Sequence, residues 1–495
     1  MDQFESILGN LENKTILITG ATGFVEKVLV EKILRVQPNV KKLYLLLRAS
    51  DANSATHRMH NEITGKELFK IVREKWAANF DSFISEKVVA LSGDVTLKDL
   101  GVKEIKVKEE LFNGIQIIIN SSANTKWDER YDVALEVNTF GVLNMLDFAK
   151  KCLNLEMVVH MSTAYVTGDR AGLILEDSSS MDEMARKTTH DIDLKEHEKK
   201  MVECKLKELQ AQDVSEEVIT NTMKDFGTSR AKLYGWENTY LLTKVMGEMY
   251  LGHSKGNLSV AVIRPTMITS TYKEPFSGWI EGFRLYDSLI GSYWKGKLTC
   301  IPVDPMSVVD VIPVDMVVNS IITAMVVNAN TSRKIIYHVG TSLRNPLKFS
   351  DFNKFMFQYC TKNPWIYNDG RPVKVGKLKM VTTMAAFRWY MQPLQGLKSL
   401  NKEFDQCFPD VCLNDDWKDK SVIRLIELYE RILLFKGIFD DTNSEELRRI
   451  ANWSYIDAEN FNFNPKCIDW EDYYIHSHIP GLAKNVIFKH SQSRL

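Results

Sequence analysis

Short apolar runs alternate with segments of helical periodicity from the start of the chain to about Gly340. Six runs are apolar at nearly every position: 15–19 (TILIT), 42–48 (KLYLLLR), 88–91, 115–120 (IQIIIN), 157–161 and 260–264. Strands buried on both faces have this continuous apolar pattern, so the runs predict a parallel sheet covered by helices on both sides. The segment 25–34, which ends before Pro38, predicts the first covering helix.

The alternation fades after Gly340, and residues 346–495 have a mostly helical pattern. The clearest amphipathic helix there is 421–435 (SVIRLIELYERILLF), and the best linker candidate is 341–350. We therefore expect an α/β fold in two parts, because 495 residues exceed what one ordinary core accommodates. Residues 1–345 would form a Rossmann-type, doubly wound parallel sheet, and 346–495 a mainly helical C-terminal domain.

A long insertion at about 178–230 interrupts the predicted sheet. It is rich in Lys, Glu, Asp and Met, and 196–210 has helical spacing. Two interpretations stay open: a solvated helical cap, or a lid over a ligand. A lid would turn four lysines towards phosphates: Lys199, Lys200, Lys205 and Lys207.

Composition excludes several classes of partner. The 63 Lys+Arg and 64 Asp+Glu nearly cancel, so there is no overall basic field for nucleic acid. The seven cysteines form no CxxC pair and no zinc spacing, which indicates reduced thiols and no metal site. No protein partner can be inferred.

The sequence contains no recognisable targeting signal. Residues 1–13 lack the features of a signal or transit peptide, and no stretch of 18 uncharged apolar residues occurs. We therefore expect a protein that faces the cytosol.

The strongest early motif is TGATGF at 19–24, between a predicted strand and a predicted helix. Glycines in a TGxxG turn let the backbone and the helix N–H groups approach a pyrophosphate. The predicted cofactor contacts are Thr19, Gly20, Thr22, Gly23 and Phe24. Glu26 departs from this pattern, because a carboxylate near a pyrophosphate is electrostatically unfavourable.

Residues at the ends of the next strands extend the predicted cofactor site. Arg48 closes the second strand, where a guanidinium can hold a 2′-phosphate and an acidic residue would favour NAD. Asp94 follows the third strand and is placed to bond an adenine. Asn120 and Ser122 follow the fourth, where small residues let the backbone pass the cofactor. The cofactor predicted is NADPH.

Tyr240 and Lys244 carry the predicted chemistry. Side chains four apart on a helix share one face, and a phenol needs a nearby cation to act as an acid or base near neutrality. A hydroxyl after the fifth strand would bond the substrate oxygen. Thr163, five residues before Gly168, is the first choice and Ser162 the alternative.

With these residues in place, the chain resembles the alcohol-forming fatty acyl-CoA reductases, closest to the plant wax and suberin type. These enzymes are extended short-chain dehydrogenases, and the resemblance covers nearly the whole chain. The segments that carry it are 20–24, 128–132, 162–166, 235–236, 238–240, 243–244, 263–266, 274–276 and 437–441.

The resemblance implies the reaction and the roles of the residues. A long-chain fatty acyl-CoA is reduced by NADPH, CoA leaves, and the bound aldehyde is reduced to a primary alcohol. Tyr240 would protonate the carbonyl oxygen, Lys244 would poise Tyr240 and grip the ribose, and Thr163 would steady the oxyanion. Pro265 joins the cofactor contacts by resemblance, and the C-terminal domain would help enclose the acyl chain. Peripheral contact with the endoplasmic reticulum is compatible with so oily a substrate.

Two departures keep alternatives open. Glu26 replaces a small residue of plant relatives, and Glu237 replaces Pro before the Asn-Thr-Tyr run. The alternatives are a weakly active or non-catalytic member, a reductase that stops at the aldehyde, and an NADP-linked epimerase or sterol dehydrogenase. Acyl chain length and oligomeric state cannot be read from the sequence.

Overall fold

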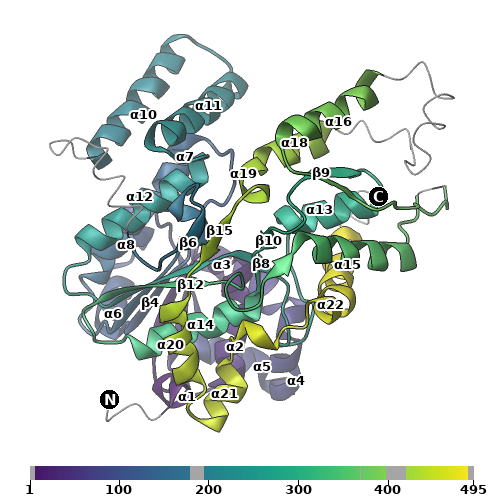
Figure 1. Cartoon of the computed structure of the whole chain (residues 1–495). Coiled ribbons are helices and arrows are strands. Elements are labelled where there is room, and N and C mark those ends of the chain that lie inside the picture. Colours follow the sequence, from purple (N-terminus) through teal and green to yellow (C-terminus); the bar gives the residue numbers. More distant parts are fainter. Residues whose placement is uncertain (1–5, 179–193, 368, 397–419, 489–495) are drawn as a thin grey trace.

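The computed structural model describes residues 6–178, 194–367, 369–396 and 420–488 (Figure 1). Its centre is a seven-stranded parallel sheet in the order β12-β7-β5-β4-β1-β2-β3. The strands are β1 (Thr15–Thr19), β2 (Lys42–Leu47), β3 (Val88–Ser92), β4 (Ile117–Asn120), β5 (Met157–Met161), β7 (Val260–Pro265) and β12 (Lys334–Val339). All six predicted strands are confirmed, although β4 starts later than expected because Ile115 caps the preceding helix.

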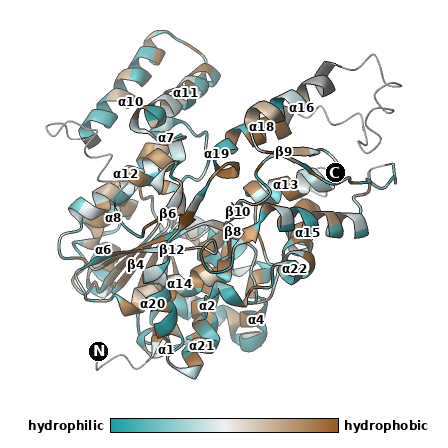
Figure 2. Ribbon diagram, viewed as in Figure 1, coloured by the Kyte–Doolittle hydropathy of each residue, from teal (hydrophilic) through white to brown (hydrophobic). Residues whose placement is uncertain are grey.

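Alternate residues of each strand pack into two separate hydrophobic clusters. In β1, Ile16 and Ile18 pack in one cluster with α2 (Phe24–Val36) and α14 (Val314–Val327), and Leu17 packs in the other with α8 (Gly141–Ala149). Because successive strand residues point to opposite faces, both faces of the sheet are buried under helices. Figure 2 shows the hydrophobic colouring concentrated along these strands. The doubly wound Rossmann-type fold is confirmed.

The remaining helices of the first part complete these two layers. They are α1 (Ile7–Asn10), α3 (Ala52–Met59), α4 (Lys70–Trp76), α5 (Phe80–Lys87), α6 (Ile105–Gly114), α7 (Tyr131–Leu135), α12 (Thr239–Ser254) and α13 (Leu285–Trp294). Helix α12 packs against α8 and ends shortly before β7 begins. Its last turn therefore lies near the start of β7, and its first turns stand at the carboxyl edge of the sheet.

The insertion forms two helices, α10 (Leu194–Ala211) and α11 (Glu216–Tyr234), which stand above α7 and α12 in Figure 1. The helix predicted at 196–210 is thereby confirmed, and 179–193 lie outside the described residues. Glu198 of α10 is fully buried and accepts hydrogen bonds from Tyr131 (2.8 Å) and Tyr234 (2.7 Å). Arg230 completes this network as the ion-pair partner of Glu198. These polar bonds anchor the insertion to the sheet domain.

The C-terminal part is mainly helical, as predicted. Its helices are α15 (Phe349–Lys362), α16 (Met384–Gly396), α18 (Lys420–Leu428), α19 (Glu430–Leu433), α20 (Thr442–Ala451), α21 (Tyr455–Phe461), α22 (Trp470–Asp472) and α23 (Ile479–Leu482). The single helix expected at 421–435 is interrupted at Tyr429, whose backbone (φ −108°, ψ 15°) leaves the helical region. The interruption turns Tyr429 towards the site described below.

Short strands connect the C-terminal part to the first. They pair β13 (Leu347–Lys348) with β10 (Val308–Val309), β14 (Lys379–Val381) with β9 (Cys300–Pro302), and β15 (Gly437–Phe439) with β6 (Gly172–Ile174). A further pair, β8 (Met267–Thr269) and β11 (Val311–Pro313), lies beside the main sheet. The Asp457 carboxylate also accepts bonds from the amides of Ile7 (3.0 Å) and Leu8 (3.2 Å). The two parts are thus joined at many points, and the boundary at 345 stays a prediction.

No helix within the described ranges is both long enough and apolar enough to cross a membrane.

Candidate active site

A cleft of about 740 Å³ opens at the carboxyl edge of the sheet. The ends of β1, β2, β4, β5 and β7, the first turns of α12, and Tyr429 from the C-terminal part form its walls. Ligands of open α/β sheets bind at this edge. Eleven of the thirteen predicted site residues line it: Gly20, Thr22, Gly23, Phe24, Arg48, Asp94, Ser122, Thr163, Tyr240, Lys244 and Pro265. None of the four lysines of the insertion is among the lining residues of the described chain.

Thr19 and Asn120, the other two, lie behind the wall. Thr19 Oγ1 donates to Asn120 Oδ1 (3.0 Å) and accepts from the amides of Ser121 (3.1 Å) and Ser122 (3.2 Å). Asn120 Nδ2 also meets His160 Nδ1 at 3.1 Å, and burial lowers the pKa of His160 well below its ordinary value. This buried chain of bonds fixes the loop after β4, so Thr19 and Asn120 support the cleft wall.

The glycine turn between β1 and α2 is built for close approach. Gly20 has φ +71°, and a Cβ there would lie 2.8 Å from the Ser122 amide nitrogen. The Gly23 amide donates to the Gly20 carbonyl (2.8 Å), which closes the turn at the start of α2. Only glycine combines that φ with so close a neighbour, so the turn can bring backbone amides to a phosphate.

Glu26 lies inside this turn and not in solvent. Its side chain is 5% exposed and accepts a hydrogen bond from Ser121 Oγ. Its other oxygen lies over Gly23, where a Cβ would come within 2.1 Å of it. Burial raises the pKa of Glu26 to about 7. The departure noted in the sequence therefore lies directly against the glycine turn.

Two arginines meet at the end of β2. Arg48 is exposed at the cleft, and its carbonyl accepts a bond from Arg58 Nη1 (2.5 Å). Arg58 lines the cleft as well and pairs with Glu62 (2.6 Å). Arg58 carries no signal in the sequence, because only the return of α3 along the sheet brings it beside Arg48. Asp94 is held by Thr96, whose amide (2.9 Å) and hydroxyl (3.0 Å) both donate to it.

Arg284 is a second lining residue that sequence reasoning missed. Its guanidinium stacks on the Phe24 ring (4.0 Å to the centroid), and Phe24 stacks in turn on Trp279 (5.3 Å between centroids). Arg284 Nη1 is buried without a hydrogen-bond partner. A lone Arg in a loop carries no sequence signal for this position, which depends on the stacking of Arg284, Phe24 and Trp279.

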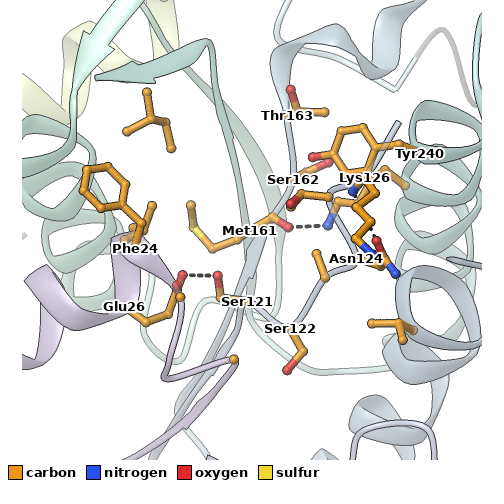
Figure 3. Close-up of a pocket in the computed structure, with 18 of the residues that line it drawn as sticks. Phe24, Glu26, Ser121, Ser122, Asn124, Lys126, Met161, Ser162, Thr163 and Tyr240 are labelled. Atoms are coloured by element: carbon orange, nitrogen blue, oxygen red, sulfur yellow. Dashed lines mark hydrogen bonds between the residues drawn. The ribbon is translucent and has the colours of Figure 1, made fainter. Parts of the chain in front are cut away.

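Tyr240 and Lys244 of α12 both line the cleft, as their spacing predicted. Figure 3 shows the Tyr240 side chain in this wall. Asn238 starts the helix, because its side chain accepts a bond from the Leu241 amide (2.9 Å). Burial raises the pKa of Tyr240 above its ordinary value, so the phenol keeps its proton near neutrality. Burial lowers the pKa of Lys244 to about 8, against the opposing effect of the Glu248 and Glu26 carboxyls.

The two candidate hydroxyls differ in their bonding. Thr163 Oγ1 accepts from the Tyr165 amide (3.4 Å) and caps the short turn Ala164–Thr167. Ser162 Oγ is buried and has no partner, although it lines the same cleft. Figure 3 shows Ser162, Thr163 and Tyr240 on the same side of the cleft. Thr163 still has its own hydrogen to donate, so both hydroxyls remain candidates.

Glu237 lies outside the cleft lining and next to Arg431 of the C-terminal part (4.0 Å). Burial raises the pKa of Glu237 to about 7. Since Asn238 caps α12 in the ordinary way, Glu237 does not displace the first turn of the catalytic helix.

The residues present fit a nicotinamide dinucleotide. The Gly20 turn has the close approach that a diphosphate needs, and Arg48 and Arg58 offer cations at the end of β2. Arg284 Nη1 has no hydrogen-bond partner among the described residues and is an available donor. Glu26 is the one lining residue of the described turn that opposes a diphosphate.

Comparisons with known proteins give the family. Two family models, both described as "Male sterility protein", match residues 18–321, the NAD-binding part, and 418–489. The chain is 46% identical to the alcohol-forming fatty acyl-CoA reductase of Simmondsia chinensis, covering 98% of this chain and all of the relative. It is 47% identical to fatty acyl-CoA reductase 1 of Arabidopsis thaliana, covering 96% and 98% of the two chains.

The chain belongs to the fatty acyl-CoA reductase family. The family resemblance inferred from the motifs is thereby confirmed, and the protein is a reductase with a nicotinamide cofactor.

Solved structures share the fold of this fatty acyl-CoA reductase. The terminal R domain of the myxalamid biosynthetic pathway aligns with a TM-score of 0.59 at 16% identity, over 96% of this chain and 91% of that one. The reductase domain of a nonribosomal peptide synthetase from Mycobacterium tuberculosis aligns with a TM-score of 0.58 at 17% identity, over 97% and 92%. At these identities the likeness supports the architecture alone.

Proposed function

We propose that this chain reduces a long-chain fatty acyl-CoA to a primary alcohol through a bound aldehyde, with NADPH as the reductant. The observation that carries the proposal is the convergence of Tyr240, Lys244 and the Ser162–Thr163 hydroxyls in one cleft with a dinucleotide-binding turn. Near full-length similarity to alcohol-forming relatives supports the substrate class. That similarity favours acyl-CoA reduction over the epimerase and sterol dehydrogenase alternatives.

The reaction balances as two reductions. In the first, acyl-CoA, one hydride and one proton give the aldehyde and free CoA as the C–S bond breaks. In the second, the aldehyde, one hydride and one proton give the alcohol. NADPH supplies a hydride to the carbonyl carbon in each step.

The side chains act on the carbonyl oxygen. Tyr240, protonated near neutrality, donates a hydrogen bond to this oxygen and then its proton. Thr163, with Ser162 beside it, donates a hydroxyl to the oxyanion that develops. The Lys244 ammonium lowers the energy of the phenolate left on Tyr240 and is placed to bond the nicotinamide ribose.

The apolar side of the cleft suits an acyl chain. It is lined by Met267 and Ile268 of β8, Leu285 of α13, and Tyr429, whose ring is tilted against the Trp127 ring at 4.4 Å between centroids. We assign the substrate tail to this wall. The C-terminal part contributes Tyr429 and so helps to enclose it, as the resemblance implies.

The test uses purified protein with NADPH and acyl-CoA substrates of increasing chain length. NADPH oxidation, release of the CoA thiol, and the aldehyde and alcohol products are measured in the same reaction. Two NADPH per CoA with alcohol as product is the expected result. One NADPH per CoA with accumulated aldehyde would support the shorter reaction, and no acyl-dependent oxidation would reject the assignment. Tyr240→Phe is the matched inactive control.

We also propose that the protein works at the cytosolic face of a membrane, with the endoplasmic reticulum as its site. Both substrate and product partition into lipid, which supports this location. Co-flotation of the purified chain with phospholipid vesicles tests this, and a chain that stays with the soluble fraction at low and high salt contradicts it.

A further inference from the structure

Glu26 places a carboxylate where the cofactor diphosphate belongs. It lies at the N-terminus of α2, bonded to Ser121 and close over Gly23, on the wall opposite Tyr240 (Figure 3). Helix N-termini attract anions through their free N–H groups and the helix dipole. In this structure the side chain of the helix itself takes that position, so carboxylate and diphosphate compete for one place.

The charged groups around Glu26 come from three elements. Lys27 follows it on α2 and is paired with Glu281 (2.5 Å). Arg284 precedes α13 and Lys244 projects from α12, and both interact electrostatically with Glu26. None of these three cations forms an ion pair with Glu26 among the described contacts, and burial raises its pKa to about 7. The carboxyl group is thus close to its protonation threshold in neutral solution.

Arg284 offers the opposite charge across the same turn. Its guanidinium is fixed on the Phe24 ring, directly beside the turn, and its Nη1 is buried with no hydrogen-bond partner. The nearest carboxylate oxygen in an ion pair with it, on Asp287, is 3.8 Å away. A buried cationic donor without a hydrogen bond is costly, and an anion in the cleft that accepts one from Arg284 Nη1 would remove this cost.

We propose that cofactor binding is linked to proton uptake by Glu26: the diphosphate displaces the carboxylate from the N-terminus of α2, pairs with Arg284, and leaves Glu26 protonated. This rests on the proposed function, since it assigns a nicotinamide dinucleotide to the cleft. Glu26 then sets how the affinity for the cofactor changes with pH, and Arg284 becomes a diphosphate ligand. A carboxylate in this turn therefore leaves the protein able to bind cofactor, in contrast to the non-catalytic alternative.

The test measures binding of NADPH to the full chain without acyl substrate. Titration calorimetry in buffers of different ionisation enthalpy gives the protons taken up per dinucleotide. We expect wild type to approach one proton at pH values above the pKa of Glu26, and its dissociation constant to rise up to about tenfold per pH unit there. Glu26→Gln should take up no such proton and bind more tightly than wild type at the alkaline end. The 2′-phosphate of NADPH titrates equally in both, so the difference isolates Glu26.

Two further variants sharpen the experiment. Glu31→Gln removes another buried carboxyl of α2, whose pKa is also raised to about 7 but which lies outside the cleft, and it should leave the proton uptake unchanged. Arg284→Gln should weaken binding at every pH and keep the proton uptake. Equal proton uptake in wild type and Glu26→Gln overturns the proposal. Failure of both to bind any dinucleotide at any pH overturns the proposed function instead.

Discussion

Lys244 Nζ donates a 2.6 Å hydrogen bond to the carbonyl oxygen of Met161, the last residue of β5. This bond ties Lys244, four residues after Tyr240, to the sheet edge that carries Ser162 and Thr163. The phenol, the ammonium and the hydroxyls are therefore held in one fixed arrangement by α12 and β5, before any ligand binds.

Tyr240→Phe should abolish acyl-dependent NADPH oxidation while the protein stays folded and binds NADPH. Phe keeps the aromatic ring and its packing, and loss of a general acid costs roughly 10²–10⁴-fold in rate. Steady-state kinetics with circular dichroism and NADPH binding check this. Near wild-type turnover in the variant would remove Tyr240 from the mechanism.

The rate should fall as pH rises through about 8, the lowered pKa of Lys244. Above this pH the ammonium loses the charge that stabilises the phenolate on Tyr240. The profile of kcat/KM reports groups of the free enzyme, so it is the measurement of choice. Lys244→Arg keeps the charge, and any activity it retains should not decline in this range. An identical decline in both proteins would assign the pKa to another group.

Thr163→Val should lower kcat strongly, because it removes a hydroxyl from the developing oxyanion and keeps the shape of the side chain. Thr163→Ser should recover most of the rate. Ser162→Ala is the matched comparison, since Ser162 Oγ has no partner to lose in the described structure. If Ser162→Ala is the more damaged variant, the main hydroxyl is Ser162 and the choice of Thr163 is wrong.

Arg48→Ala should weaken NADPH binding and leave NADH binding unchanged. A hydrogen bond to a charged group contributes about 1.5–3 kcal/mol, which corresponds to roughly 10–100-fold in the ratio of the two dissociation constants. Fluorescence titration with both dinucleotides measures this ratio. Arg58→Ala tests the second cation at the end of β2, and an unchanged ratio in both variants would place the 2′-phosphate elsewhere.

Glu26 should also make the cofactor-free protein less stable as pH rises. Its pKa is raised from 4.5 to about 7, so its contribution to stability is full below about 4.5 and is lost as pH rises through 7. Ionising the buried carboxyl would cost up to about 3 kcal/mol. The stability of Glu26→Gln relative to wild type should therefore increase from acid to alkaline pH, as measured by urea unfolding at each pH. A constant difference would mean that folding does not raise the pKa of Glu26.

The sequence predicted the sheet well because buried parallel strands are apolar at every position. The runs at β1 and β5 were placed residue for residue. β12 was missed, since Tyr337 and His338 interrupt its apolar run at the edge of the sheet. The sequence predicts one helix at 421–435, because the apolar periodicity continues through Tyr429. The structure has two helices there, since the backbone turns at Tyr429.

At the site, motif residues were predictable and their partners were not. Spacing alone brought Tyr240 and Lys244 to one face of a helix. Arg284, by contrast, reaches the glycine turn only through stacking on Phe24, which depends on the packing of distant elements. The sequence shows that Glu26 departs from the pattern of the glycine motif. Its burial and its hydrogen bond to Ser121 are seen only in the structure.

The contact of Asp457 with the amides of Ile7 and Leu8 has a consequence for biosynthesis. Ile7 and Asp457 are 450 residues apart in the chain, so α1 gains this carboxylate partner only after the segment that carries Asp457 has been synthesised. Two fragments of the chain divided between α1 and Asp457 would each carry one partner of this contact. Reconstitution of the protein from such fragments would have to restore the contact.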